Sequence, residues 1–122
     1  MRTRLLILGL ALALPTLLFA QTSTPASRIA WDQAAADLAT AQALTYRYYP
    51  DGASTGTVFS GVTCSGTASP FTCSVAFPAF SPGPHSLTLS AANAAGESAK
   101  SAAVSFTFVV IPAVPANPRI VP

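Results

Sequence analysis

Hydrophobic and polar residues alternate along several short stretches of this chain, and the clearest long alternation covers residues 82–92. There His85, Leu87, Leu89 and Ala91 fall on one face, while small residues fall on the other. Successive side chains of a strand point to opposite faces, so this pattern predicts a half-buried β-strand. A Pro-Gly-Pro turn precedes the strand and the sequence NAAG ends it.

Five further stretches carry the same strand signal, at residues 28–32, 44–49, 57–64, 71–77 and 103–111. Between the first two lies an alanine-rich segment with almost no apolar stripe, which predicts a long loop with room for one helical turn. The six strands are spaced by turns and lack the long crossovers that parallel strands need. The pattern therefore predicts an all-β chain folded as an antiparallel sandwich.

The alternation also divides the large side chains between an inner and an outer face. The inward positions predict these core residues: Trp31, Tyr46, Tyr48, Leu87, Leu89, Phe106 and Phe108. The candidate binding surface consists of the following residues: Arg47, Tyr49, Phe59, Phe71 and Phe80. Stacked on one flat face, such aromatic rings would suit a sugar or a peptide, whereas packing inside the sandwich is the alternative use of the same residues.

Two cysteines, Cys64 and Cys73, lie in predicted neighbouring strands on either side of the turn-like sequence SGTASP. Their spacing is not that of a CxxC redox or metal motif, and an even number of cysteines in an exported chain favours a disulfide. If the two face each other, Val62 lies opposite Val75 and one face of the hairpin is mostly apolar. The sequence therefore predicts a structural disulfide, with reactive or metal-binding thiols as the alternative.

Residues 1–20 have the layout of a secretory signal peptide. Arg2 and Arg4 precede an apolar run, and Pro15 breaks that run shortly before a small residue at Ala20. The run is short for a membrane span, although an uncleaved anchor and a buried helix remain alternatives. We therefore expect a secreted or extracytoplasmic protein that begins with a flexible leader at residues 21–27.

Removal of residues 1–20 would also remove two of the six basic residues, leaving four against four acidic ones. The mature chain would then have no net charge. Without a basic patch it lacks the electrostatic attraction that nucleic-acid binding requires, and nothing directs it to an anionic membrane surface. We expect neither nucleic acid nor membrane among the partners of the mature protein.

No combination of residues predicts a catalytic or metal centre. His85 is the single histidine, and no Gly-x-Ser-x-Gly sequence is present to expose a nucleophilic serine. The four acidic residues are scattered, without the spacing of a paired-carboxylate site or a calcium loop. The sequence therefore predicts no enzyme, no cofactor and no bound metal, and assigns His85 to the core or its rim.

The segment HSLTLSAANAAGESAKSAAVSFTF resembles the last two strands of a fibronectin type III module, an immunoglobulin-like fold of six to seven strands. His85 falls where that family usually has a tyrosine, and Asn93 and Gly96 fall on their counterparts. The resemblance covers residues 28–111 and implies a β-sandwich module of a secreted bacterial or phage-type protein. Two departures stand out: the family's first strand is missing before Trp31, and the cysteine hairpin pairs where the family crosses between sheets.

Residues 112–122 form a proline-rich tail or linker that we expect to be extended. A missing first strand would leave an open sheet edge, which Arg119, Ile120 and Val121 of the tail would fill by strand addition, in their own chain or in a second copy. The expected function is a non-enzymatic module for adhesion, spacing or protein interaction, with a protein or glycan ligand. The alternative function is a carbohydrate-binding module that uses exposed aromatic rings.

Overall fold

Short β-strands dominate the computed structural model, which describes residues 21–122. In chain order the elements are β1 (Gln21–Ser23), β2 (Arg28–Gln33), α1 (Leu38–Ala43), β3 (Thr45–Pro50), β4 (Thr57–Val58), β5 (Thr63–Ser65), β6 (Phe71–Ala76), β7 (Gly83–Asn93), β8 (Gly96–Glu97) and β9 (Val104–Phe108). The all-β prediction is confirmed at this level. No helix among residues 21–122 is long and apolar enough to span a membrane. The predicted signal peptide lies outside the described residues.

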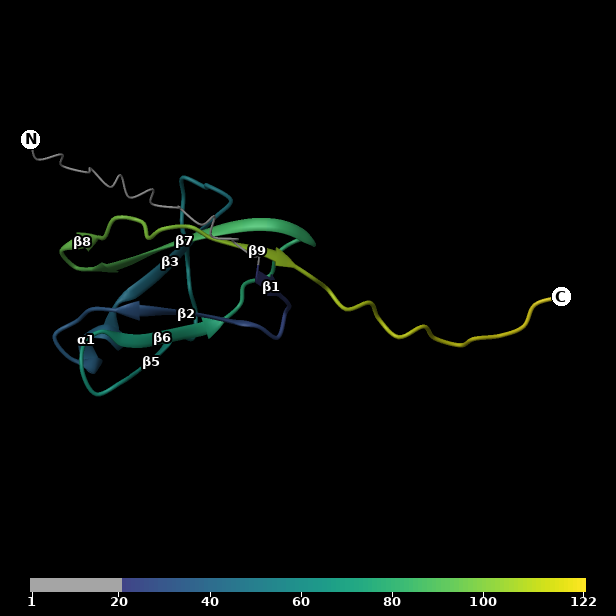
Figure 1. Ribbon diagram of the computed structural model, residues 1–122, viewed down its shortest axis with the longest axis horizontal. Coiled ribbons are helices and arrows are strands. Elements are labelled where there is room, and N and C mark those ends of the chain that lie inside the picture. Colours follow the sequence, from purple (N-terminus) through teal and green to yellow (C-terminus); the bar gives the residue numbers. More distant parts are fainter. Residues whose placement is uncertain (1–20) are drawn as a thin grey trace, which may run out of the picture.

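The strands form two sheets, an arrangement compatible with a sandwich (Figure 1). The larger sheet has the order β1-β9-β7-β3-β4, with β8 paired to the end of β7, and the smaller has the order β2-β6-β5. Apart from β1, which runs parallel to β9, all pairs are antiparallel. The predicted strand at residues 82–92 thus becomes β7, which pairs with both β3 and β9.

The core lies between the sheets and takes side chains from both. Its buried members are Ile29, Ala41, Tyr46, Phe59, Cys64, Phe71, Cys73, Val75, Leu87, Phe106 and Phe108. Three further predicted core residues, Trp31, Tyr48 and Leu89, are partly buried and pack against this cluster. All seven predicted core residues therefore lie in the core or against it.

The disulfide between Cys64 and Cys73 is confirmed, and the two residues lie directly opposite each other on β5 and β6. Tyr46 reaches it from the other sheet, with its hydroxyl 3.5 Å from the Cys73 sulfur. The same hydroxyl donates a hydrogen bond to the Ala41 carbonyl of α1 at 2.8 Å. One buried tyrosine therefore joins the larger sheet, the disulfide and the helix.

Helix α1 lies inside the segment predicted as a long loop with a helical turn. Asp37 begins it, because its carboxylate accepts a hydrogen bond from the Thr40 backbone N–H at 2.7 Å. This N-terminal cap and the run of alanines favour a helix in a segment without an apolar stripe. Only Ala41 of its six residues is buried. Gln42 also ties the helix to the segment at β5, because its side chain donates to the Val62 carbonyl and accepts from the Cys64 N–H, both at 2.7 Å.

The single strand predicted at residues 57–64 is wrong, because the chain changes sheets within it. β4 pairs with β3 in the larger sheet, whereas β5 pairs with β6 in the smaller one. Gly61, between the two, has a φ of +81°, a conformation that glycine adopts without steric cost. The crossing that seemed to be missing from the sequence is therefore present, and the cysteine hairpin begins only after it.

The flexible leader predicted at residues 21–27 is also wrong in its first half. Gln21, Thr22 and Ser23 form β1, and the Val109 N–H extends this ladder by donating to the Ser23 carbonyl at 2.8 Å. The hydrophobic pattern did not predict this strand, because its side chains are polar and it is held mainly by backbone hydrogen bonds. The edge of β9 is therefore occupied, and the tail cannot fill it as a missing first strand.

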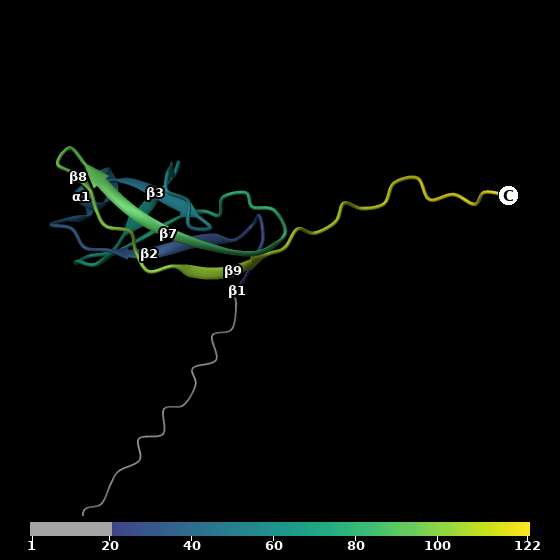
Figure 2. The same ribbon diagram turned by 90° about the horizontal axis from the view of Figure 1, so that it is seen from above.

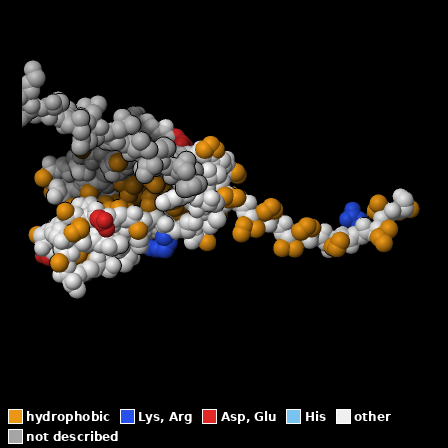
Figure 3. All heavy atoms as spheres, in the orientation of Figure 1, with side chains coloured by type: hydrophobic (Ala, Val, Ile, Leu, Met, Phe, Trp, Pro, Cys, Tyr) orange, Lys and Arg blue, Asp and Glu red, His pale blue; other side chains and the backbone are white. Residues whose placement is uncertain are grey.

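The tail after β9 has no helix or strand, and all residues from 109 to 122 are exposed. Figures 1 and 2 show it projecting from the end of the two-sheet body opposite α1 and β8. Hydrophobic side chains lie along the whole projection, with one basic group near its end (Figure 3). In the described structure the tail is thus a projecting segment without helix or strand.

Candidate functional site

A cavity of about 440 Å³ opens at the end of the body that carries α1 and β8. We call it the loop-end cavity, and its lining residues are Gln33, Ala34, Ala35, Thr40, Leu44, Ala91, Ala92, Asn93, Ala95, Gly96, Glu97 and Ser98. They come from the end of β2 with its following loop, from α1 and from the hairpin of β7 and β8. Segments distant in sequence therefore meet here because their strands end at the same edge of the body.

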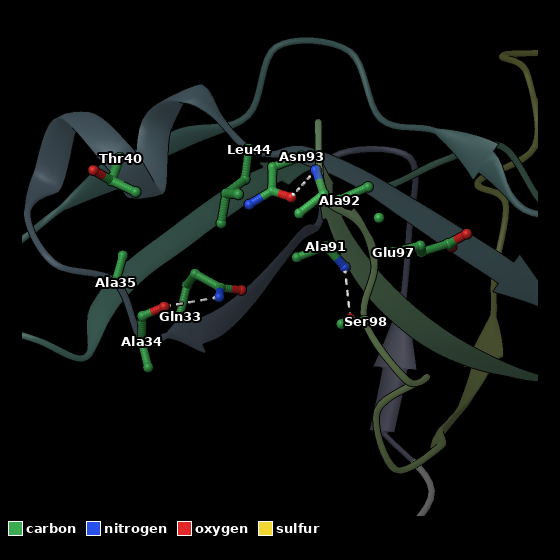
Figure 4. A pocket seen from close by; sticks show the side chains of 12 residues that line it. Gln33, Ala34, Ala35, Thr40, Leu44, Ala91, Ala92, Asn93, Glu97 and Ser98 are labelled. Atoms are coloured by element: carbon green, nitrogen blue, oxygen red, sulfur yellow. Dashed lines mark hydrogen bonds between the residues drawn. The ribbon is translucent and has the colours of Figure 1, made fainter.

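The chemistry of the loop-end cavity is that of amides, hydroxyls and small apolar groups. In Figure 4 the side chains of Leu44 and Asn93 lie beside each other, with Gln33 across from them. Part of this polar surface is held by local bonds, since Asn93 accepts from the Ala95 N–H and Ser98 accepts from the Ala91 N–H. Such groups can bind a peptide backbone or polar side chain through hydrogen bonds, and the alanines leave room for its approach.

The sequence missed this site because none of its residues is unusual in itself. The signal that could have located it is topological: loops that follow strands of the two sheets gather at one end of a sandwich. Sequence reasoning placed the candidate surface on aromatic residues instead, and the structure separates those residues.

Three of the four candidate aromatic rings are buried and do not form a flat exposed face. Tyr49 is 6% exposed, Phe59 8% and Phe71 3%, while Phe80 is half-buried among Phe77, Phe106 and Phe108. Phe59 packs on Trp31 and Tyr48 inside the body. The candidate aromatic surface is therefore corrected, because these rings serve packing. The crossing loop carries Phe59 inward, the turn before β7 carries Phe80 inward, and Phe71 lies on the buried face of β6.

Tyr49 is buried for a different reason from the others, since it does point away from the core as the alternation predicts. Its ring lies under the loop at Gly56, where an added Cβ would be 2.6 Å from the ring, and the Lys100 ammonium lies 4.2 Å from its centre. Its hydroxyl donates to the Glu97 carboxylate, which also accepts from Ser90. These two bonds, Ser90 first, hold the pKa of Glu97 below its ordinary value.

Arg47, the remaining candidate surface residue, is one-third exposed and lies 3.8 Å from the Glu97 carboxylate. Arg47, Tyr49, Ser90, Glu97 and Lys100 thus form one network on the outer face of the larger sheet. Its bonds tie the segment after β8 to β3 and β7. The network therefore fixes one wall of the loop-end cavity, to which Glu97 belongs.

The structure brings His85, Asp51 and Ser81 together in an order that resembles a serine-hydrolase triad. His85 Nδ1 is 2.8 Å from Asp51 Oδ2, and its Nε2 is 3.3 Å from the Ser81 hydroxyl. However, Nε2 is also 2.7 Å from the Ser81 carbonyl, an oxygen that only accepts. Both ring nitrogens therefore face acceptors, an arrangement that suits the doubly protonated ring and argues against its use as a general base.

This triad-like cluster acts instead as a clamp between the turn after β3 and the start of β7. Asp51 accepts from the Ser86 backbone N–H at 2.9 Å and from His85 through its other oxygen. Hydrogen bonding to Asp51 and to the Ser81 carbonyl raises the pKa of His85 above its ordinary value. The bonds from His85 and Ser86 lower the pKa of Asp51. The charged forms of both side chains are thus favoured by folding.

We expect a pH dependence of stability from this clamp, with opposite signs at its two ends. His85 adds stability that is fully present below its ordinary pKa near 6.5 and is lost as pH rises through its raised folded pKa. Asp51 adds stability that is present above 3.8 and is lost as pH falls through its lowered folded pKa. Melting temperatures of wild type and His85→Gln should therefore differ most between these two pH values and converge at alkaline pH.

The matched control for that measurement is Asp51→Asn. Asparagine keeps an oxygen for the Ser86 N–H, and it replaces the charged oxygen that His85 faces by an amide NH2 group. Asp51→Asn should make the melting temperature less dependent on pH on the alkaline side, as His85→Gln does. A wild-type profile that does not change between pH 5 and pH 9 would contradict the clamp.

No family model, curated protein or solved structure matches this chain. Function must therefore be argued from the strand order, the loop-end cavity and the surfaces described above.

Proposed function

We propose that this protein is a secreted, non-enzymatic module with an immunoglobulin-like sandwich fold of the fibronectin type III kind, and that it binds a protein partner through its loop-end cavity. Adhesion is the role that such binding would serve, and the projecting tail gives the module a spacer or linker on its other side. Each part of this proposal rests on a separate feature of the chain.

The fold assignment is supported by the strand order, which carries the proposal. In immunoglobulin-like sandwiches one sheet contains the first, second, fourth and fifth strands, and the other contains the third, sixth and seventh. β1 departs from this order, because it pairs with β9 of the other sheet. β2, β5 and β6 correspond to the first set, and β3, β7 and β9 to the second, with β4 as the additional edge strand next to β3. The crossing at Gly61 provides the change of sheet between β4 and β5.

Secretion is supported by the disulfide, because such bonds persist in oxidising compartments and are rare in the reducing cytosol. The signal-peptide layout of residues 1–20 points to the same compartment. A non-enzymatic role is supported by the clamp geometry, in which the only histidine faces a hydrogen-bond acceptor at each of its nitrogens. Binding by loops at the end of a rigid sandwich is a common use of this architecture.

Protein is favoured over sugar as the ligand because the aromatic rings needed for sugar stacking are packed inside the body. The loop-end cavity offers amides, hydroxyls and small side chains, which suit a polar peptide surface. The carbohydrate-binding alternative would have to use the same polar groups without a stacking platform.

The proposal can be tested by capture of the purified, oxidised protein on surfaces coated with extracellular-matrix proteins and on an array of purified glycans. Thr40→Arg places a long charged side chain at the loop-end cavity and leaves the Asp37 cap to the Thr40 backbone intact. We expect it to reduce protein capture about tenfold, because the inserted side chain and its charge would block close contact at the cavity, and a tenfold loss corresponds to about 1.4 kcal/mol.

The matched control is Thr55→Arg, an equally exposed threonine in the loop after β3. That loop lies at the other end of the larger sheet, because Pro50 pairs with Leu87 whereas Thr45 pairs with Ala92 beside β8. It should leave capture unchanged. Capture of glycans in place of proteins would support the carbohydrate-binding alternative, and equal losses in the two variants would contradict the loop-end cavity as the binding site.

A further inference from the structure

Strand β2 has a free edge in the described part of the chain, because it stands at the end of its sheet with β6 on its other side. The Phe77 N–H donates to the Ser27 carbonyl, so Ser27 and every second residue after it in β2 are the positions that hydrogen-bond to β6. Alternate residues bond to β6, so the backbone groups of Arg28, Ala30 and Asp32 point to the free edge. An edge of this kind is a template for another strand.

Two hollows lie along this edge, between β2 and the strands β1 and β9 with the segment before β9. One has a volume of about 350 Å³ and is lined by Ile29, Phe77 and Leu89 among others. The other has a volume of about 170 Å³ and is lined by Trp31 and Leu89 among others. The first also contains Ser23, whose hydroxyl is buried without a hydrogen-bond partner in the described structure. This side of the body is therefore incompletely filled.

The end of the tail has the properties of a strand that suits this edge. Ile120 is fully exposed and Val121 is 68% exposed, so their apolar surfaces are unburied in a single chain. Arg119 is the one charged residue among positions 109–122. Pro118 and Pro122 flank these three residues. The two prolines are four positions apart, so in a strand their nitrogens point to the same side.

We propose that residues 118–122 of one copy add to the free edge of β2 in a second copy, as an antiparallel strand. The register we infer is Arg119 opposite Asp32, Ile120 opposite Trp31, and Val121 opposite Ala30. Three independent features of the chain meet in this one register.

The first feature is the hydrogen-bond phase. The backbone N–H and C=O groups of Asp32 and Ala30 point out from the free edge. Arg119 and Val121 lie opposite them and have the backbone N–H groups that these hydrogen bonds require. The two prolines of the tail fall at positions whose nitrogens point away from β2, where the lack of an N–H costs nothing. A shift by one residue would place both prolines at bonding positions.

The second and third features are burial and charge. Trp31 faces the inside of the body, so Ile120 opposite it enters the side where the hollows lie. Asp32 is exposed on the outer face, so Arg119 opposite it forms a cross-strand ion pair. A shift by two residues keeps the proline phase and loses this charge pair, with Val121 then placed opposite Arg28.

A second copy is the occupant we infer, because the tail of the same chain leads away from this edge. Figure 1 shows β9 and β2 running in opposite directions, with the tail leaving the body beyond β9. To lie antiparallel to its own β2, the tail would first have to return along the whole strand. Prolines at positions 112, 115 and 118 hold it extended, at about 3 Å per residue, and so direct it toward a neighbouring molecule.

Sedimentation of the full chain, expressed for export and recovered oxidised, tests the proposal over a wide range of concentrations. The wild-type mass should rise with concentration, to a dimer or a longer open assembly. Arg119→Asp and Asp32→Arg should each weaken association about fivefold or more, because like charges then face each other across the strands. The double variant Asp32→Arg/Arg119→Asp should restore it.

Val114→Lys is the matched control, since it adds a charge to an exposed apolar residue of the tail outside the paired segment. It should leave association unchanged, and circular dichroism should show that all variants are folded. A wild-type mass that stays monomeric at all concentrations would overturn the proposal. So would a double variant that associates no better than the single ones, or a monomer whose melting temperature falls when Ile120 is replaced by alanine.

Discussion

Replacing Cys64 and Cys73 together by alanine should lower the free energy of unfolding by about 3 kcal/mol. The disulfide closes a ten-residue loop, and restricting the unfolded chain in this way contributes about 2.7 kcal/mol on the chain-entropy account. Loss of the two buried sulfurs, which contact Tyr46, adds to that cost. For a domain of this size the melting temperature should fall by roughly 10–20 °C, measured by circular dichroism.

The matched control for the disulfide is the next pair along the same hairpin, Ser65 and Thr72. They lie opposite each other on β5 and β6 as the cysteines do, and both are exposed. Their double replacement by alanine should change the free energy of unfolding by about 0.5 kcal/mol or less. Reduction of the wild-type protein should reproduce the cysteine result, and an unchanged melting temperature after reduction would contradict it.

Leu87→Ala should destabilise the protein by about 2–5 kcal/mol, which places it with the disulfide among the most damaging changes. Leu87 is fully buried at a position of β7 where Pro50 of β3 and Val104 of β9 are its register partners. Truncation there removes apolar burial and leaves a cavity between rigid neighbours. Urea unfolding of the oxidised protein measures the effect as a lower midpoint with an unchanged slope.

Val110→Ala is the control for that substitution. Val110 is an apolar residue that is 47% exposed in the tail, so its shortening should alter stability by about 0.5 kcal/mol or less. If Leu87→Ala costs less than about 1 kcal/mol, the central packing position assigned to this side chain is wrong.

Much of the fold could be predicted from alternation because each long strand has one face against the core. The bounds of β2, β3, β6 and β7 lie within one residue of the stretches that the pattern indicated, and β9 ends three residues earlier than its stretch. The cysteine pairing could be predicted because both residues fall on the inward face of neighbouring strands. Alternation and cysteine position are local signals. They predict burial correctly when one face of a strand packs against the core and the other face does not.

The remaining errors have causes that a local pattern does not record. Alternation continues through residues 57–64 although the chain leaves one sheet for the other at Gly61. β1 is held by backbone bonds, so its polar side chains gave no signal. Tyr49 was placed on the correct face, but that face is covered by the loop at Gly56 and by Glu97 and Lys100 from a distant part of the chain.

The candidate site was less predictable than the fold. The loop-end cavity combines residues from three segments, and the clamp joins Asp51 to His85 across 34 positions. Neither can be inferred without the sheet register that brings β3 beside β7. The sequence did identify His85 as the residue on which any catalytic proposal depends, and the hydrogen bonds at both of its nitrogens are what argue against that role.

The parallel pairing of β1 with β9 determines how the body responds to a pulling force. A pull on the two ends of the body acts on Gln21 at the start of β1 and on Phe108 at the end of β9. The two strands run in the same direction, so such a pull slides one along the other and loads all the hydrogen bonds between them at once. A three-residue strand with polar side chains is then the part of the molecule that resists tension first.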